Sequence, residues 1–275
     1  MIDLPAGASG RSAEDVAREA ASRASAIMLE RFRALEAGLP IDRTVKGRGN
    51  FLTEADLACE TAAMDVLRAE YPDHAVLSEE TATSVERWDR GWLWVIDPID
   101  GTSNFSRGIP TFAFNIALCH DGEPMLGLTR QPVTGAEFFA VQGGGAFANG
   151  VPVRVPEVPT LAEALMGIGL GYDYERARLL LELLAGMWPA MMTIQNIGSA
   201  ALGLAYAASG RFDIYVHSNL YPWDMAAGIV QVREAGGLVL ARDGGPISIY
   251  GEGIIAGAPG PVREFAEKTR DKKWR

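Results

Sequence analysis

The 275-residue chain has little cysteine, and two residues of this type, Cys59 and Cys119, are too few for a disulfide-stabilised scaffold of this size. Neither cysteine has neighbours at metal-ligand spacing. The three histidines, His74, His120 and His217, also lack the spacing of a zinc site. Cysteine usage of this kind is typical of a protein from a reducing compartment.

Positive charge and long apolar runs are also scarce. The chain has 25 Lys and Arg residues against 35 Asp and Glu residues, which gives a formal net charge of −10 at pH 7. An acidic surface repels a phosphate backbone, although a small anionic substrate stays compatible once cations are bound. No apolar run approaches the roughly 20 residues of a membrane helix, and residues 1–7 lack the basic and apolar segments of a signal peptide. We therefore expect a cytoplasmic protein with neither nucleic-acid nor membrane partners.

Composition and patterning predict a single folded domain. Hydrophobic residues make up 48% of the chain and charged residues 22%, values that exclude a disordered or fibrous protein. Helix and strand patterns alternate without a linker or repeat. We expect one domain over residues 1–275, with an α+β half over about 1–155 and an α/β half over about 156–275 that share one cleft.

Hydrophobic periodicity, capping residues and turn dipeptides locate the elements. Helices are expected near 12–35, 53–71, 174–187, 198–209, 223–235 and 261–271. Strands are expected near 43–47, 75–78, 92–96, 112–118, 125–129, 137–141, 211–216, 237–241 and 253–256. Two glycine-rich stretches formally resemble dinucleotide fingerprints. The first, 143–148, leads into an Asn-Gly hairpin turn at 149–150, and the second, 167–171, has the wrong spacing.

A hydrophobic strand that runs directly into two acids is the most informative part of the sequence. Buried charge is costly unless a cation compensates for it. Pro98 fixes the turn between Asp97 and Asp100, so that both carboxylates and the Ile99 carbonyl converge. These are the hard oxygen ligands that Mg²⁺ and Mn²⁺ prefer. The following segment 101–103 is expected to form a tight turn whose amides are suited to an anion. The plainer interpretation of residues 97–103 is an Asx turn that ends a strand.

The segment Asp97–Phe105 closely resembles the signature of the inositol monophosphatase family, which are Mg²⁺-dependent, lithium-sensitive phosphatases. Three further motifs resemble those of the family in the right order: Leu52–Asp56; Ser78–Glu80, with Ser where Gly is usual; and Pro222–Gly228 followed by Glu234–Gly237. The segment Gly143–Gly150 also looks like the family's glycine-rich β segment. The resemblance implies a layered αβαβα sandwich of mixed α+β and α/β class, a homodimer, and hydrolysis of a small phosphate monoester by metal-activated water.

The resemblance also implies a metal site. In the family, carboxylates at the positions of Glu79, Asp97, Asp100 and Asp224 bind metal, and the position of Ile99 binds it through its carbonyl. Asp97 would bridge two ions. The implied cofactor is Mg²⁺, as two or three ions, with Mn²⁺ as a substitute.

Catalytic and substrate roles follow from the same resemblance. The positions of Thr102 and Asp56 orient the nucleophilic water in the family. The positions implied to contact the substrate are Asp100, Gly101, Thr102, Gly198, Ser199, Ala200 and His217.

Several of these residues have plainer interpretations that stay open at the level of sequence. Asp56 is also placed to complete a helix-capping box, and Asp224 is placed to be the N-cap of the helix that follows it. Glu79 is compatible with an exposed pair of loop acids. The turn 198–200 is compatible with an ordinary helix start.

The sequence departs from inositol-specific relatives at His217, where those members usually carry a Glu that contacts ring hydroxyls. A neutral imidazole offers one donor and one acceptor, and below about pH 6.5 it becomes a cation. We therefore expect weaker binding of a polyol and a preference for a substrate with a second negative group. Relatives with the same core hydrolyse fructose 1,6-bisphosphate, 3′-phosphoadenosine 5′-phosphate or histidinol phosphate. The alternatives are that His217 points away and ends the strand 212–216, and that the protein is a regulator that binds a phosphorylated ligand without turnover.

Overall fold

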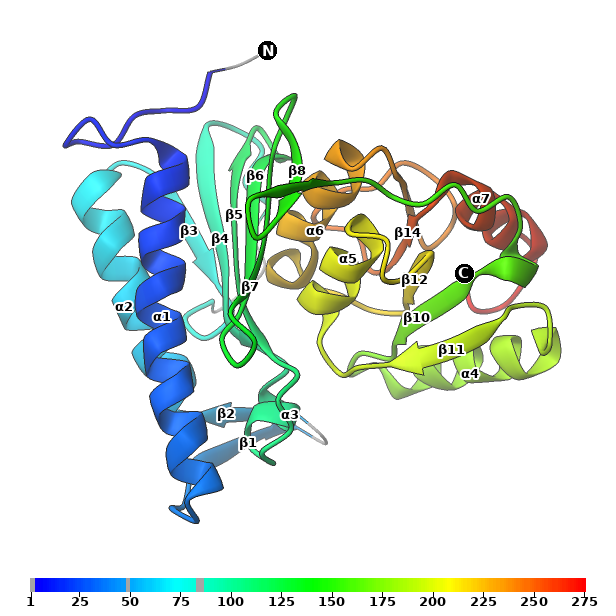
Figure 1. The fold of residues 1–275 in the computed structure, drawn as a ribbon, viewed down its shortest axis with the longest axis horizontal. Helices are drawn as coiled ribbons and strands as arrows, with labels where there is room; N and C mark the ends of the chain where they lie inside the picture. Colours follow the sequence, from blue (N-terminus) through cyan, green and yellow to red (C-terminus); the bar gives the residue numbers. More distant parts are fainter. Residues whose placement is uncertain (1–2, 48–49, 83–86) are drawn as a thin grey trace.

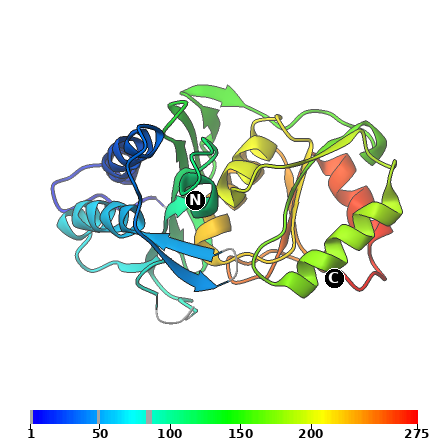
Figure 2. The ribbon, with the colours of Figure 1, turned by 90° about the horizontal axis from the view of Figure 1, so that it is seen from below.

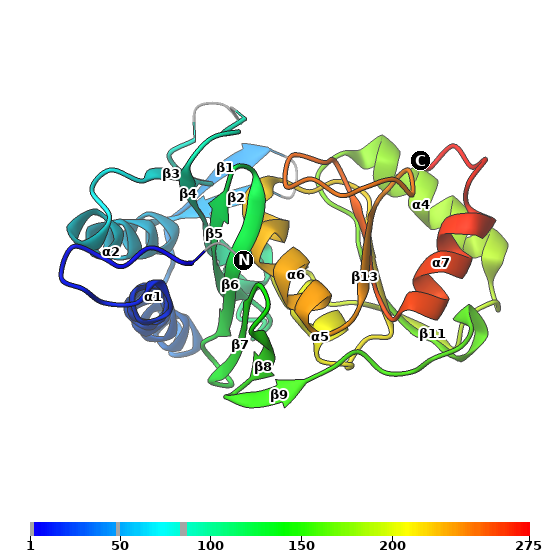
Figure 3. The same ribbon diagram turned by 90° about the horizontal axis from the view of Figure 1, so that it is seen from above.

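The computed structural model describes residues 3–47, 50–82 and 87–275. Its helices and sheets alternate in five layers, as Figure 3 shows from above and Figure 2 from below. The layers are, in order, α1 (Ala13–Glu36) with α2 (Glu54–Glu70), a seven-stranded sheet, α5 (Ala200–Ala208) with α6 (Pro222–Glu234), a five-stranded sheet, and α4 (Tyr174–Met187) with α7 (Pro259–Lys268). The predicted αβαβα sandwich is confirmed. The division into halves near residue 155 stays a prediction.

The seven-stranded sheet runs in the order β3-β4-β5-β6-β7-β8-β9. Its strands are β3 (Ala75–Ser78), β4 (Trp92–Asp100), β5 (Ala113–His120), β6 (Glu123–Gln131), β7 (Ala136–Val141), β8 (Gly145–Ala148) and β9 (Val151–Val153). Only the first pair, β3 and β4, is parallel among these neighbours. Asn149 and Gly150 both have positive φ, at 50° and 75°, so the expected hairpin turn joins β8 to β9.

The five-stranded sheet includes two strands that the sequence patterns did not predict. Its order is β11-β10-β12-β14-β13, with β10 (Leu165–Gly169), β11 (Thr193–Asn196), β12 (Ile214–His217), β13 (Leu238–Ala241) and β14 (Ile254–Gly257). The missed strands are β10 and β11. Strand β10 carries Gly167 and Gly169, and a Cβ at these positions would overlap the rings of Phe212 and His217. The glycines that weaken the strand pattern therefore make room for aromatic side chains of the neighbouring segment.

A small two-stranded sheet lies at one end of the layers (Figure 1). The sheet of β1 (Arg43–Gly47) and β2 (Asn50–Thr53) contacts α3 (Thr102–Phe105), and a short 3₁₀ helix, η1 (Leu161–Glu163), precedes β10. Ser12 caps α1 as expected, because its hydroxyl accepts the Asp15 N–H at 3.1 Å. Within the described residues, each helix is too short or too polar to cross a bilayer.

Helix α6 packs directly on the first sheet. A Cβ on Gly127 of β6 would lie 2.6 Å from both the Cα and the carbonyl oxygen of Ala227 in α6. On its other side, Gly228 of α6 closely approaches Leu204 of α5. The glycines therefore let α6 pack tightly between the sheet and α5, and this packing fixes the height of its first turn above the sheet.

Substituting Gly127→Ala tests this close packing. The new methyl group meets backbone atoms of Ala227, which cannot move as a side chain can, so we expect a loss of about 1–3 kcal/mol. For a chain of this size that corresponds to a fall in Tm of about 2 °C or more, measured by differential scanning calorimetry. The control is Gly186→Ala in α4, where the added Cβ meets nothing within 4 Å. An unchanged or higher Tm for Gly127→Ala would contradict the close packing.

Candidate functional site

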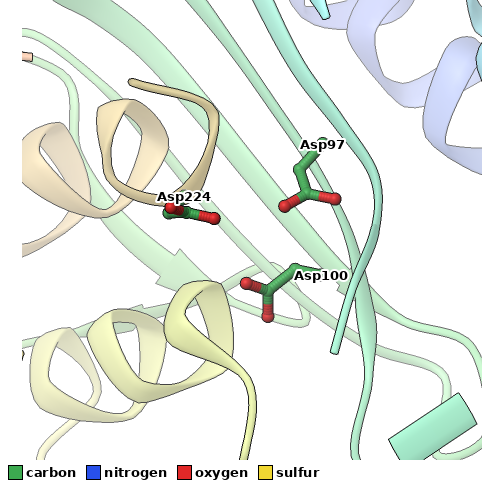
Figure 4. A group of neighbouring side chains, drawn as sticks. All are labelled: Asp97, Asp100 and Asp224. Atoms are coloured by element: carbon green, nitrogen blue, oxygen red, sulfur yellow. The ribbon is translucent and has the colours of Figure 1, made fainter. Parts of the chain in front are cut away.

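A cavity of about 240 Å³ lies where β4 of the first sheet faces β10 and β12 of the second. Its lining includes the end of β4 and the first turns of three helices, α3, α5 and α6. Figure 4 shows Asp97, Asp100 and Asp224 pointing toward one another, the first two from β4 and the third from α6. Acids that are up to 127 positions apart in the chain thus meet in one cavity.

These three acids form the centre of the site. One carboxylate oxygen from each of Asp97, Asp100 and Asp224 lies within 4.8 Å of the others. Burial, together with the charges of Glu79 and Asp100, raises the pKa of Asp97 well above its ordinary value. Burial, followed by the charges of Asp100 and Glu79, raises the pKa of Asp224 in the same way. Burial also raises the pKa of Asp100 to about 6, against the opposing hydrogen bond from Ser199.

A hard divalent cation fits this donor set. Asp97 is 1% exposed, and its Oδ1 has no hydrogen-bond partner among the described residues. A buried carboxylate oxygen without a partner is costly, and like charges in contact add to the cost. A cation bound by several carboxylate oxygens would remove both penalties. The acids therefore have the chemistry and the proximity of a metal site.

Glu79 lines the same cavity from the residue after β3. Lys46 Nζ lies 3.4 Å from Glu79 Oε1 and also pairs with Glu80. Burial raises the pKa of Glu79, and it raises the pKa of Glu80 to about 7. The interpretation of these two acids as an exposed loop pair is wrong, because their side chains are only 19% and 1% exposed.

Asp56 uses its two carboxylate oxygens for two different contacts. Oδ2 accepts the backbone N–H of Thr53 at 2.7 Å and so caps α2. Oδ1 lies 3.1 Å from the hydroxyl of Thr102, which is also 2.9 Å from the carbonyl oxygen of Ile99. The capping contact is therefore present, but it is not the only contact that Asp56 makes.

Asp224 repeats this arrangement in α6. The helix begins at Pro222, so Asp224 is its third residue, and the prediction that Asp224 is the N-cap is wrong. Proline is favoured in the first helical turn, where its missing N–H is no loss. Tyr221 is the N-cap, and its N–H donates to Asp224 Oδ2 at 2.7 Å. The carboxylate of Asp224 thus both caps α6 and faces Asp97 and Asp100.

The first turn of α5 contacts Asp100. Ser199 is the N-cap, and its hydroxyl accepts the Leu202 N–H at 3.2 Å and donates to Asp100 Oδ1. The N–H of Ala200 donates to Asp100 Oδ2 at 3.1 Å. Gly198, with φ of 72°, precedes the cap and also lines the cavity. The turn is therefore an ordinary helix start that also forms part of the cavity wall.

His217 is the last residue of β12 and lines the cavity, so the alternative that it points away from the site is wrong. Its ring is buried, and its Nδ1 accepts the N–H of Asn219 at 3.3 Å. Burial lowers the pKa of His217 to about 3. The prediction that it becomes a cation below about pH 6.5 is therefore wrong, because the buried site disfavours the charged ring.

Aromatic side chains also line the cavity. Tyr172, Tyr215, Tyr221 and Trp223 line the cavity, and the sequence analysis predicted no site role for any of them. Tyr221 stacks on Trp223 with ring centroids 5.0 Å apart. No Lys or Arg lines the cavity in the part of the chain that the structure describes. Lys46 pairs with Glu79 from outside this lining, so among the described residues the wall offers no basic side chain to Asp97, Asp100 and Asp224.

The five layers and the buried acid cluster define a class, the layered αβαβα proteins that include metal-dependent phosphatases. A model described as the inositol monophosphatase family matches residues 11–274, and the chain belongs to that family. A protein named Nus factor SuhB from Pasteurella multocida is 35% identical over 233 residues, which are 84% of this chain and 86% of that protein. The structure of the extragenic suppressor protein suhB from Bartonella henselae has a TM-score of 0.85 at 32% identity, over 94% of this chain and 98% of that one. The IMPase of Thermotoga maritima has a TM-score of 0.80 at 30% identity, over 94% and 96% of the two chains.

Asp97→Asn should stabilise the metal-free protein at alkaline pH. Because the folded pKa of Asp97 is raised above its unfolded value of about 4, the folded state binds more protons, and stability falls as pH rises through the folded pKa. Removing the charge should raise Tm at pH 8 without metal and have a smaller effect near pH 4. Mg²⁺ should raise Tm of the wild type much more than that of the variant. Asp65→Asn, exposed on α2, is the control. A lower metal-free Tm of Asp97→Asn at pH 8 would contradict the repulsion described above.

Proposed function

We propose that the protein is a Mg²⁺-dependent phosphatase that hydrolyses a small phosphate monoester by direct attack of water, without a covalent intermediate. The observation that carries the proposal is the group of Asp97, Asp100 and Asp224 at the wall of a cavity, with an Asp97 oxygen that has no hydrogen-bond partner among the described residues. Membership of the inositol monophosphatase family supports it. Monoester hydrolysis has one of the largest uncatalysed barriers, with dense negative charge to be stabilised.

The proposed ligands of two or three Mg²⁺ ions are Glu79, Asp97, Asp100, Asp224 and the carbonyl of Ile99, with Mn²⁺ as a substitute. When bound, such ions neutralise phosphate charge and acidify water. The chain itself supplies the geometry. Asp100 is held by α5 and Asp224 by the capping contact in α6, so neither acid needs to be ordered when a cation arrives.

Thr102 and Asp56 are the proposed pair that orients the attacking water. With the Ile99 carbonyl engaged as a ligand, the Thr102 hydroxyl donates to Asp56 Oδ1. The lone pairs of Thr102 Oγ1 are then free to accept a proton of the water. Asp56 cannot turn away, because its other oxygen is bonded to Thr53. The amides of Gly101 and Thr102 are the proposed phosphate contacts.

The cavity wall favours a substrate with a single phosphate on an uncharged alcohol. A second phosphate would face acids and aromatic rings without a basic side chain among the described lining residues. His217 is neutral, and because its Nδ1 accepts from Asn219, its Nε2–H is the donor that it can offer to a ligand. On these observations we propose a monophosphate substrate in place of the bisphosphate expected from the sequence. The remaining substrate contacts proposed are Asp100, Gly198, Ser199 and Ala200.

A second candidate function is a regulator that binds a phosphorylated ligand in the same cavity without turnover. The observation that favours it is the name Nus factor carried by SuhB relatives, since that name does not describe a phosphatase. Because relatives carry this name, the absence of a nucleic-acid partner stays a prediction. Lithium sensitivity, a homodimer and a cytoplasmic location also stay predictions.

A phosphate-release assay separates the two candidates. We expect Mg²⁺-dependent turnover that a chelator abolishes, with inositol 1-phosphate and nucleoside monophosphates hydrolysed in preference to fructose 1,6-bisphosphate, because the wall lacks a basic partner for a second phosphate. The measurement is kcat/KM for each substrate at saturating Mg²⁺. If no substrate is turned over with Mg²⁺ or Mn²⁺ while Mg²⁺ and a phosphorylated ligand still raise Tm, the regulator is the better conclusion.

Thr102→Ala should lower kcat by about 100-fold or more while KM changes much less, because the hydroxyl acts on the water and not on the substrate. Asp56→Asn should lower kcat and also lose about 1 kcal/mol of stability through the weakened cap of α2. Ser12→Ala, which removes the cap of α1 far from the site, is the matched control. If Asp56→Asn lowers Tm as Ser12→Ala does and leaves kcat unchanged, capping is the only role of Asp56.

A further inference from the structure

A buried row of polar residues connects the acids to the sheet beneath α6. In strand register, Asp97 of β4 lies opposite Asn115 of β5, Asn115 opposite Thr129 of β6, and Thr129 opposite Phe138 of β7. Directly opposed residues share a face of the sheet. Asn115 and Thr129 are 1% and 0% exposed. The face of the sheet that carries Asp97 therefore continues under α6 as a row that includes two buried polar side chains.

Helix α6 is bonded to this row at two points. Gln231 Nε2 donates to Thr129 Oγ1 and to the carbonyl oxygen of Phe138, both at 3.1 Å. Thr129 Oγ1 donates to Asn115 Oδ1 at 2.7 Å, and Asn115 Nδ2 donates to the carbonyl oxygen of Trp223 at 2.7 Å. The Thr129 hydroxyl accepts one bond and donates the next, so the direction of the whole chain is defined.

The two points lie on either side of the close contact between Gly127 and Ala227. Trp223 and Gln231 are eight positions apart, or about 12 Å along a helix axis at 1.5 Å per residue. Trp223 directly precedes Asp224, so the bond from Asn115 holds the peptide that leads into the acid. One side chain therefore lies opposite Asp97 in the sheet and binds next to Asp224 in the helix.

Stability alone gives no reason for this network. Apolar residues of similar size would fill an interface between a sheet and a helix without the cost of burying amides and a hydroxyl. The network also leaves Gln231 Oε1 buried without a partner among the described residues. What it does supply is a fixed position for the first turn of α6, whose Asp224 has a carboxylate oxygen within 4.8 Å of those of Asp97 and Asp100.

We propose that Asn115 is a positioning residue that sets the separation of Asp224 from Asp97, and through it the affinity of the site for its divalent cation. The inference rests on the proposed function, since it assumes that a cation binds between these acids. Asn115 itself touches neither the cation nor the substrate in this account. It acts through the carbonyl of Trp223.

Asn115→Leu tests the proposal, because it keeps the approximate volume of the side chain and removes the bond to Trp223. Partners that orient metal ligands typically contribute about 10-fold or more to metal affinity. We therefore expect the Mg²⁺ concentration that gives half of the maximal rise in Tm to increase by about 10-fold. We expect kcat at saturating Mg²⁺ to change much less, because the assembled site has the same ligands.

Gln231→Met is the matched control, since it breaks the other end of the network and leaves the bond from Asn115 to Trp223 in place. It should lower the metal-free Tm while the half-saturating Mg²⁺ concentration stays within about twofold of the wild type. This separates positioning from general loss of stability. Equal half-saturation for Asn115→Leu, Gln231→Met and the wild type would overturn the proposal.

Asn115→Asp is a second variant, to be used if the Asn115→Leu protein does not fold. Its carboxylate is isosteric but cannot donate to the Trp223 carbonyl when ionised. The added negative charge would by itself strengthen Mg²⁺ binding, so weaker binding supports the proposal and stronger binding overturns it. A wild type whose Tm does not respond to Mg²⁺ would instead show that the proposed function fails, whatever the variants do.

Discussion

Repulsion between carboxylates that share one buried cavity is the constraint to which the surrounding structure responds. Burial and like charge raise the pKa of Asp97 and Asp224 together, and no basic side chain lines the cavity among the described residues. Three acids are held by the first turns of helices, where backbone N–H groups and the helix dipole favour negative charge: Asp56 in α2, Asp100 at α5 and Asp224 in α6. Helix starts therefore support the acids, one of them in the outer layer (α2) and two in the middle layer (α5 and α6).

Local sequence predicted the parts of the site that depend on local physics. A hydrophobic strand that ends in acids is visible in residues 92–100, and the start of α2 at Thr53 follows from capping rules. Strand β10 could not be predicted in this way. Its glycines leave space for the rings of Phe212 and His217, and these residues lie about 45 positions further along the chain. The protonation of His217 depends on burial, and burial is set by the tertiary fold. An unperturbed pKa was therefore the wrong starting point.

The polar network was missed for a related reason. Asn115 and Thr129 look like the polar positions of ordinary strands, and Gln231 looks like the solvent side of an amphipathic helix. In the sandwich, α6 is covered by the sheet on one side and by α5 on the other, so it has little solvent side on which to place a glutamine. A rule that assigns polar residues to the surface holds for outer layers such as α1 and does not hold for a helix between two sheets.

The double use of Asp56 and Asp224 changes what their presence in a sequence can reveal. Each carboxylate caps its own helix with one oxygen, so selection for folding alone would retain it in a descendant that had lost all turnover. Asp97 caps no helix in the described structure, and one of its oxygens is buried without a partner. Folding alone would favour its replacement. Among the three acids that meet in the cavity, Asp97 is therefore the one whose presence the folding of a helix does not explain.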